Sequence, residues 1–153
     1  MNSINNNNLT PSFRGFNYSN KTKKILESRG EWSDFEKIIP EMTRKGRNTN
    51  INFEITTIPS LYVFPETTIR CEIKPKNNIK SNPITRALGL ANKQYYGYGQ
   101  YNINDNRATE KTFRDIYESA LIDHRDNAKK AKETRKTIIN NIKSFFLKTK
   151  NNV

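Results

Sequence analysis

The sequence has little of what several classes of protein require. Of its 153 residues one is cysteine and one is histidine, which excludes an intrachain disulfide framework and a zinc site. No apolar run approaches the roughly 18 residues needed to cross a bilayer, and residues 1–10 lack the pattern of a secretory signal. We therefore expect a soluble protein that is not secreted, has no membrane partner, and is intracellular in a cytoplasm, an organelle or a virion.

Large apolar residues are also scarce. Leu, Ile, Val and Phe together make up about 22% of the chain, close to the roughly 20% below which charged chains tend to be disordered. Aromatic residues compensate in part, because each can bury about 150 to 250 Å². We predict one small α+β core domain over residues 20–124, a flexible arm over residues 1–19, and a basic helix over residues 125–153. The aromatic residues of the arm either anchor a partner or touch the core.

Positive charge is what the sequence has in excess. The chain holds 27 Lys and Arg against 15 Asp and Glu, a formal charge of +12. Residues 72–93 carry five cations and one carboxylate, residues 125–153 carry nine cations and two carboxylates, and residues 94–124 between them are slightly acidic. Part of this bias fits an AT-rich genome, which enriches lysine. Clustering nevertheless favours an anion-binding surface over a uniformly charged one.

Two helices are predicted near the start of the core. Sparse apolar residues indicate a helix over residues 20–29. Ser33 and Glu36 form the Ser-x-x-Glu pattern of a capping box, in which each side chain accepts a backbone N–H at the helix start. We therefore expect a second helix over residues 34–45, bent or interrupted at Pro40.

A period of two follows over residues 51–75, where apolar and polar residues alternate. This alternation is typical of strands with one buried face. It predicts a small three-stranded antiparallel sheet, with strands at residues 51–55, 61–64 and 69–73. Cys71 would then lie on the buried face as a structural residue.

Two more segments complete the predicted core. Asn82 as a cap and Pro83 as the first helical residue indicate a helix that runs to about residue 93 and covers the sheet. The stretch over residues 95–101 alternates glycine with bulky rings, which favours a loop over a helix.

The strongest helical pattern begins after Thr109, a good N-cap residue. Apolar residues repeat at helical spacing to residue 121, thin out, and return from Ile138 to residue 146. The pattern predicts either one helix of about 40 residues that projects from the domain, or two helices that break near Asp126. His124 follows the apolar stripe and is expected to be a packing residue.

The basic part of this helix is the first candidate site. Cations spaced along a helix neutralise phosphates and release counterions, which gives salt-sensitive and largely sequence-independent binding. A solvated helix face is the alternative. The six candidate cations are Arg125, Lys129, Lys130, Lys132, Arg135 and Lys136, to which we add Lys74, Lys76 and Lys80 from the earlier basic block.

The tyrosine-rich stretch is the second candidate site. Aromatic rings beside cations can stack on unpaired bases, so this stretch favours RNA or single-stranded DNA over base-read duplex DNA. The alternative is that the rings serve as substitute core. The four residues are Tyr95, Tyr96, Tyr98 and Tyr101.

The triplet Glu72-Ile73-Lys74 at the end of a predicted strand is the third candidate. It resembles half of the signature of a family of metal-dependent nucleases, in which Pro-Asp is followed after a strand by Asp/Glu-x-Lys. The resemblance implies that Glu66 and Glu72 hold Mg²⁺ and that Lys74 positions or activates the attacking water. The chain has no Pro-Asp, and Pro65-Glu66 would have to replace it.

From the sequence we thus expect a non-enzymatic protein that binds RNA or DNA without a cofactor, within a nucleoprotein assembly such as a ribosome, a virion or a replication complex. A Mg²⁺-dependent endonuclease is the first alternative. The second is an assembly factor that forms homo-oligomers through the amphipathic C-terminal helix, with Ile138, Ile142 and Phe145 in the contact.

Overall fold

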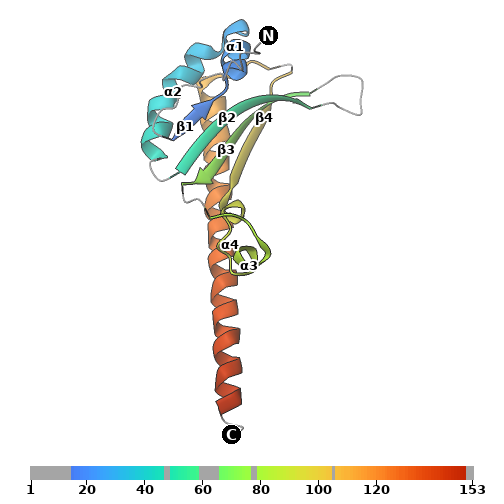
Figure 1. The fold of residues 1–153 in the computed structure, drawn as a ribbon. Helices are drawn as coiled ribbons and strands as arrows, with labels where there is room; N and C mark the ends of the chain where they lie inside the picture. The colour runs from blue at the N-terminus through green and yellow to red at the C-terminus, as the bar shows by residue number, and fades with distance from the viewer. Residues whose placement is uncertain (1–14, 47–48, 59–65, 77–78, 105, 151–153) are drawn as a thin grey trace, which may run out of the picture.

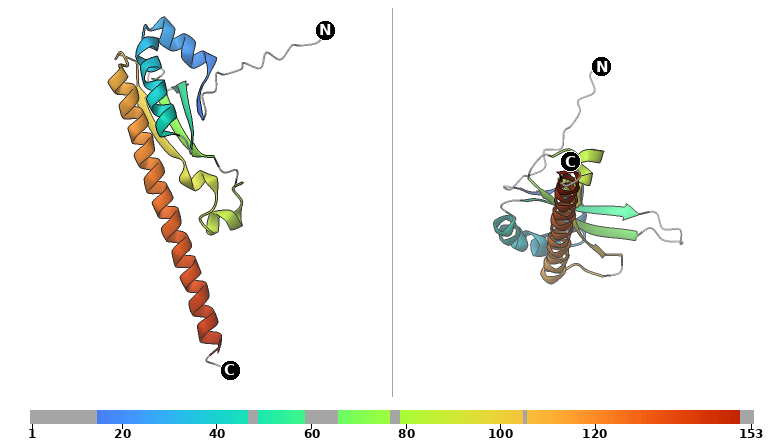
Figure 2. Two further views of the ribbon diagram at one scale, coloured as in Figure 1. Left: turned by 90° about the vertical axis from the view of Figure 1, so that its left-hand side faces the viewer. Right: turned by 90° about the horizontal axis from the view of Figure 1, so that it is seen from below.

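The computed structural model describes residues 15–46, 49–58, 66–76, 79–104 and 106–150. They form a four-stranded sheet, helices that pack on it, and one long C-terminal helix that extends far beyond the sheet (Figures 1 and 2). The elements in chain order are β1 (Phe16–Tyr18), α1 (Asn20–Ser28), α2 (Trp32–Lys45), β2 (Thr49–Ile58), β3 (Glu66–Pro75), α3 (Pro83–Ala87), the 3₁₀ helix η1 (Asn92–Tyr95), β4 (Gly97–Asn102) and α4 (Glu110–Lys150).

The sheet has the strand order β1-β2-β3-β4, in which β1 is parallel to β2 and the other neighbours are antiparallel. One face carries the apolar residues of the alternating pattern, and Phe53 pairs with Cys71 at its centre. Both α2 and α4 pack on this face. The ring centre of Phe35 in α2 lies 5.2 Å from that of Phe53 in β2 and 5.1 Å from that of Phe113 in α4. The opposite face, here called the open face, carries polar side chains and tyrosines.

The α+β class and the antiparallel pairing of the two alternating segments are confirmed, and Cys71 is fully buried. Burial raises the pKa of its thiol, which keeps the sulfur protonated at neutral pH. The predicted strand over residues 61–64 lies outside the described residues. The sheet is mixed and four-stranded among those residues, rather than three-stranded and antiparallel, because β1 and β4 join its two edges.

The prediction of a flexible arm over residues 1–19 is wrong for β1 (Phe16–Tyr18), and residues 1–14 of that arm lie outside the described residues. Phe16 and Tyr18 are buried in the core, and the ring of Phe16 lies 5.7 Å from that of Phe53. The alternative that these aromatic residues pack on the chain's own core is therefore right for both. In a chain with few aliphatic residues they supply apolar area that the core otherwise lacks.

The helix α2 begins two residues earlier than the capping box predicts. Ser33 lies inside the helix, Glu31 occupies the cap position, and no side chain caps this end. Pro40 does not interrupt the helix. Gly46 follows its last residue and donates its N–H to the carbonyl of Met42 at 2.8 Å.

The helix α3 starts as predicted, with a capping box between Asn82 and Thr85, but it ends at Ala87 rather than near residue 93. Gly89 adopts a φ of +66°, the left-handed conformation that turns the chain away from the helix. Ile84 of α3 is 70% exposed. This helix therefore does not cover the sheet.

The tyrosine-rich stretch is a strand preceded by a turn of 3₁₀ helix, rather than the predicted loop. Its glycines face α4 so closely that a Cβ atom on Gly97 would lie 2.1 Å from the carbonyl oxygen of Ala120, and one on Gly99 2.0 Å from that of Ile116. The backbone of the helix thus rests directly on the strand. Glycine is needed here for close approach, not for flexibility.

The helix α4 is continuous over 41 residues, which confirms the first of the two predicted alternatives. At 1.5 Å per residue it is about 60 Å long. Its first half packs on the sheet and on α2, and its second half projects beyond them (Figures 1 and 2). In the described part of the chain, no helix combines the length and the apolar character needed to cross a membrane.

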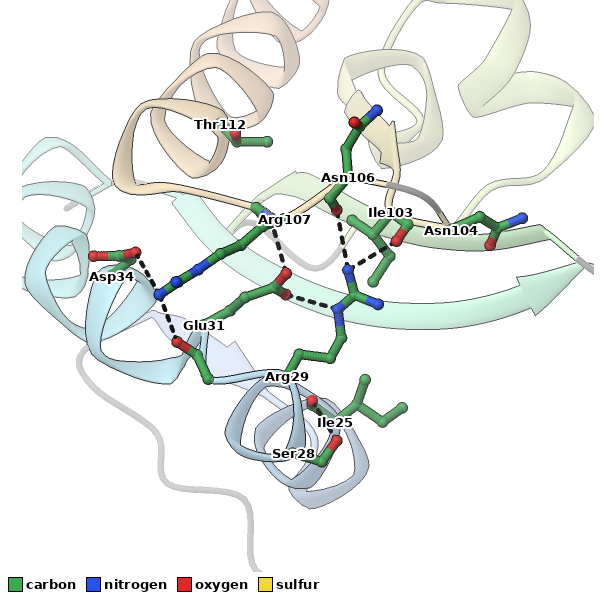
Figure 3. Close-up of polar contacts among 12 residues, drawn as sticks. Ile25, Ser28, Arg29, Glu31, Asp34, Ile103, Asn104, Asn106, Arg107 and Thr112 are labelled. Carbon is green, nitrogen blue, oxygen red and sulfur yellow. Dashed lines mark hydrogen bonds and ion pairs between the residues drawn. The ribbon is translucent and has the colours of Figure 1, made fainter.

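A buried carboxylate joins the N-terminal helices to the segment before α4 (Figure 3). Glu31, 1% exposed, accepts a hydrogen bond from the N–H of Ala108 at 2.9 Å and one from Nε of Arg29 at 3.0 Å. The same guanidinium donates to the carbonyl oxygens of Ile103 and Asn106 at 2.8 and 3.0 Å. The α1–α2 corner is thereby tied to the end of β4 and to the start of α4.

We expect Glu31→Gln to lower the free energy of unfolding by about 3 kcal/mol, because it removes one partner of a charge pair whose carboxylate is buried. Thermal denaturation should show this as a fall in Tm of about 6 to 12 °C. Glu36→Gln on the exposed face of α2 is the control and should stay within about 0.5 kcal/mol of the native protein. Equal Tm values for the two variants would contradict the role given to Glu31.

Candidate nucleic-acid interface

The fold brings the two basic blocks of the sequence together. The turn after α3 lies against α4, because a Cβ atom on Gly89 would lie 2.5 Å from the carbonyl oxygen of Ala131 and 3.5 Å from Cβ of Arg135. Figure 1 shows α3 and η1 beside α4 just beyond the sheet. Residues 79–93 therefore adjoin the start of the basic part of α4, although the acidic segment separates them in the sequence.

Five exposed side chains form the dense part of the basic surface on α4. We call them the helix cations: Lys129, Lys130, Lys132, Arg135 and Lys136. Within the part of the chain that the structure describes, none of the five forms an ion pair with a carboxylate. Arg125, one turn earlier, is exposed too, as are Lys76, Lys80, Arg86 and Lys93 on the adjoining segment. The fold therefore places none of the helix cations in an ion pair among the described residues, and Asp126 and Glu133 are the only carboxylates on the same stretch of α4.

Part of this charge forms a row along the helix. Lys129, Lys136 and Lys143 follow one another at intervals of seven residues, so they lie on one side of α4 about 10 Å apart. Lys132 lies close to the same line. A row of cations about 20 Å long fits an extended polyanion better than a small anion, since a small anion needs cations that converge on one point.

A second group of side chains lies on the open face of the sheet. The ammonium of Lys74 is 5.4 Å from the ring centre of Tyr96, and the guanidinium of Arg70 is 5.7 Å from that of Tyr98. Lys74 also pairs with Glu72 at 2.6 Å. Burial raises the pKa of Tyr98 to about 12, and the charge of Glu72 adds to this effect. The Tyr98 hydroxyl is therefore neutral at physiological pH, and the residue is 44% exposed.

The four tyrosines of the second candidate site do not act as one surface. Tyr95 donates its hydroxyl to the carbonyl oxygen of Gly89, and Tyr101 packs against the core. Tyr96 and Tyr98 remain on the open face, with ring centres 6.3 Å apart in an edge-on arrangement. The prediction of base stacking thus narrows to these two rings.

Side chains of α4 hold this tyrosine segment in place. Asp123 accepts the N–H of Tyr98 at 3.0 Å, Asn127 donates to the carbonyl of Tyr96 at 2.7 Å, and His124 bonds to the carbonyl of Tyr95. The expected packing role of His124 is confirmed. Asp123, Asn127 and Arg70 are not among the site residues predicted from the sequence. Only Arg70 had a signal there, because the period of two places it on the same face as Glu72.

The third candidate site is not assembled. Glu66 and Glu72 lie six residues apart on β3, which separates them by about 20 Å along the strand. The structure thus keeps Glu72 and Lys74 together but does not bring Glu66 to them. Across residues 15–150 without the four gaps, no group of three or more His, Cys, Asp or Glu side chains is placed to hold a metal ion.

The geometry supplies two features that suit a polyanion, the helix cations with the adjoining basic segment and, on the open face, the exposed Tyr98 beside the half-buried Tyr96. Each is built from residues with no second role in the core. Comparison with protein-family models, with curated proteins and with solved structures finds no match for this chain.

Proposed function

We propose that this protein binds RNA or single-stranded DNA, largely independently of sequence, as a non-enzymatic component of a nucleoprotein assembly such as a ribosome, a virion or a replication complex. One observation carries the proposal. The segments that carry the two basic blocks, which are distant in sequence, adjoin each other where Gly89 packs against Ala131, and none of the helix cations forms an ion pair with a carboxylate within the described residues. Phosphates are the ligands that such a surface accommodates, because each contact releases condensed counterions.

The open face supports the preference for unpaired strands. Bases of a single strand are free to stack on exposed rings, whereas those of a duplex are already stacked on one another. Tyr98 offers a partly exposed ring on β4, and the guanidinium of Arg70 supplies positive charge beside it. A strand bound along α4 could reach this face at the point where η1 joins β4.

We expect the affinity for a single-stranded oligonucleotide to fall steeply with salt. A plot of log K against log salt concentration should have a slope of about −4, the value for six phosphate contacts at about 0.7 each. Fluorescence anisotropy with labelled RNA, single-stranded DNA and duplex DNA of equal length measures the slope and the preference. No binding at about 0.05 M salt, or a slope near zero, would exclude the proposal.

The physiological ligand can be identified separately. The protein should be purified from its own cells without nuclease treatment, and the nucleic acid that elutes with it sequenced. We expect many unrelated sequences of one nucleic acid type. A single defined sequence would contradict binding that is independent of sequence, and absence of nucleic acid would argue against the assembly role.

A further inference from the structure

The projecting end of α4 exposes a concentration of large apolar side chains. Among described residues, five of the nine exposed large hydrophobic side chains lie within nine positions of this helix: Ile139, Ile142, Phe145, Phe146 and Leu147, at 41 to 66% exposure. Contiguous exposed apolar surface of this kind marks interaction sites in soluble proteins. The nucleic-acid proposal does not use these side chains.

Most of them continue the stripe that packs on the sheet. Phe113, Ile116 and Ala120 are buried by the sheet and α2, and Ala131 is buried beside Gly89. Ile138, Ile142 and Phe145 follow at intervals that keep the same helix face. The apolar face of α4 is therefore one stripe, of which the sheet covers only the first part.

We propose that this uncovered part, Ile138, Ile139, Ile142, Phe145 and Phe146, here called the tail stripe, packs against the tail stripes of further copies of this chain in a helical bundle. Ile138, Ile142 and Phe145 occupy the core positions of a heptad pattern, and Ile139 and Phe146 widen it on one side. A face of this width suits a helix that contacts two neighbours, whereas a two-stranded coiled coil needs a narrower seam.

Most of the remaining positions of the segment suit the outside of a bundle, and the exposed Leu147 is the exception. Glu133, Thr137, Asn140 and Ser144 lie away from the tail stripe, and the Lys136–Lys143 row lies beside it. Because α4 projects beyond the sheet, its last turns stand clear of the sheet of their own chain (Figure 2).

The exposed apolar area of the tail stripe determines how strong the association can be. The two phenylalanines, each about two thirds exposed, contribute roughly 200 to 300 Å². With the isoleucines, one tail stripe offers less than the roughly 800 Å² per partner of a stable complex. A bundle of three or four tails buries each stripe against two neighbours, so we expect association at high protein concentration rather than a permanent oligomer.

Electrostatics give this association a distinctive salt dependence. Tails that carry several lysines repel one another, and added salt screens the repulsion. Packing of apolar side chains is not weakened by salt. Association of tails should therefore become stronger as salt rises, whereas binding of an acidic partner, an anionic lipid surface or a nucleic acid should become weaker.

Sedimentation equilibrium of the full chain tests the proposal. From about 10 to about 500 µM protein, the mean mass should at least double, and more readily at about 0.5 M than at about 0.1 M salt. Phe145→Gln with Phe146→Gln should stay monomeric. Ile84→Gln, at a similarly exposed apolar side chain on α3, is the control and should associate as the native protein does.

Three outcomes would overturn the proposal. They are a native monomer throughout this range, association that the double variant retains, and association that weakens as salt rises. A native monomer that sediments with phosphatidylserine vesicles, while the double variant does not, would assign the tail stripe to a lipid surface instead. Circular dichroism checks that the double variant keeps α4, and a short oligonucleotide, too short for two copies, should bind it as tightly as the native protein.

Discussion

Replacing the five helix cations by glutamine is expected to weaken binding of a single-stranded oligonucleotide by about 100- to 3,000-fold at about 0.1 M salt. Relative to 1 M salt, each phosphate contact adds about 0.7 logarithmic units of affinity at this concentration, so three to five lost contacts give this range. The salt slope should fall in parallel, by about 2 to 3.5. Anisotropy titrations at several salt concentrations measure both quantities.

A matched variant separates local contacts from the general field of a basic protein. It replaces five exposed cations outside the interface and has the same net charge: Lys21, Lys24, Lys37, Arg44 and Lys111. We expect its affinity to fall by less than about tenfold and its salt slope to change by less than about 1. If the two variants lose affinity equally, the binding reflects net charge, and the interface on α4 is wrong.

Replacing Gly99 by alanine is expected to destabilise the fold by about 3 kcal/mol or more, since overpacking against backbone atoms cannot be relieved by a change of rotamer. The new Cβ atom would lie 2.0 Å from the carbonyl oxygen of Ile116, far inside van der Waals contact. To accept it, α4 must move away from β4. Such a shift would also open the contacts that the helix makes with the sheet on either side of this point.

Thermal and urea denaturation should show a fall in Tm of about 6 to 12 °C or more for Gly99→Ala. Gly97→Ala should behave alike, because its Cβ atom would meet the carbonyl oxygen of Ala120 at 2.1 Å. Gly30→Asn is the control: nothing lies within 4 Å of a Cβ atom there, and Asn tolerates its φ of +69°. A Tm within about 2 °C of the native value for Gly99→Ala would show that the helix does not rest on the strand.

These glycines also show why part of the fold could not be predicted from the sequence. In residues 95–101 the alternation with tyrosine contains a strand period, but glycine is more often a sign of a turn. Only the position of α4, set by contacts distant in sequence, makes a glycine-lined strand favourable. The strand β1 could not be predicted for a related reason. Its three residues are too few for a local pattern, and their parallel pairing with β2 depends on contacts distant in sequence.

Patterns of neighbouring residues did predict the helices and strands that depend mainly on interactions close in sequence. The alternation over β2 and β3, the capping box of Asn82, and the helical stripe after Thr109 all lie where the sequence indicated. The Ser33 capping box failed because the buried bonds of Glu31 fix the start of α2 elsewhere. For the candidate site, the cations could be identified from the sequence. The proximity of the two basic segments could not, because it arises only from the tertiary fold.

The continuity of α4 has a mechanical consequence. A single helix without a break behaves as a stiff rod. The first half of α4 is held in place by direct contact with the backbone of β4. The stretch from Ala131 to Lys150 spans about 30 Å, so whatever binds near its end stands at a set distance and direction from the open face of the sheet. Within an assembly the chain would then act as a spacer of fixed length.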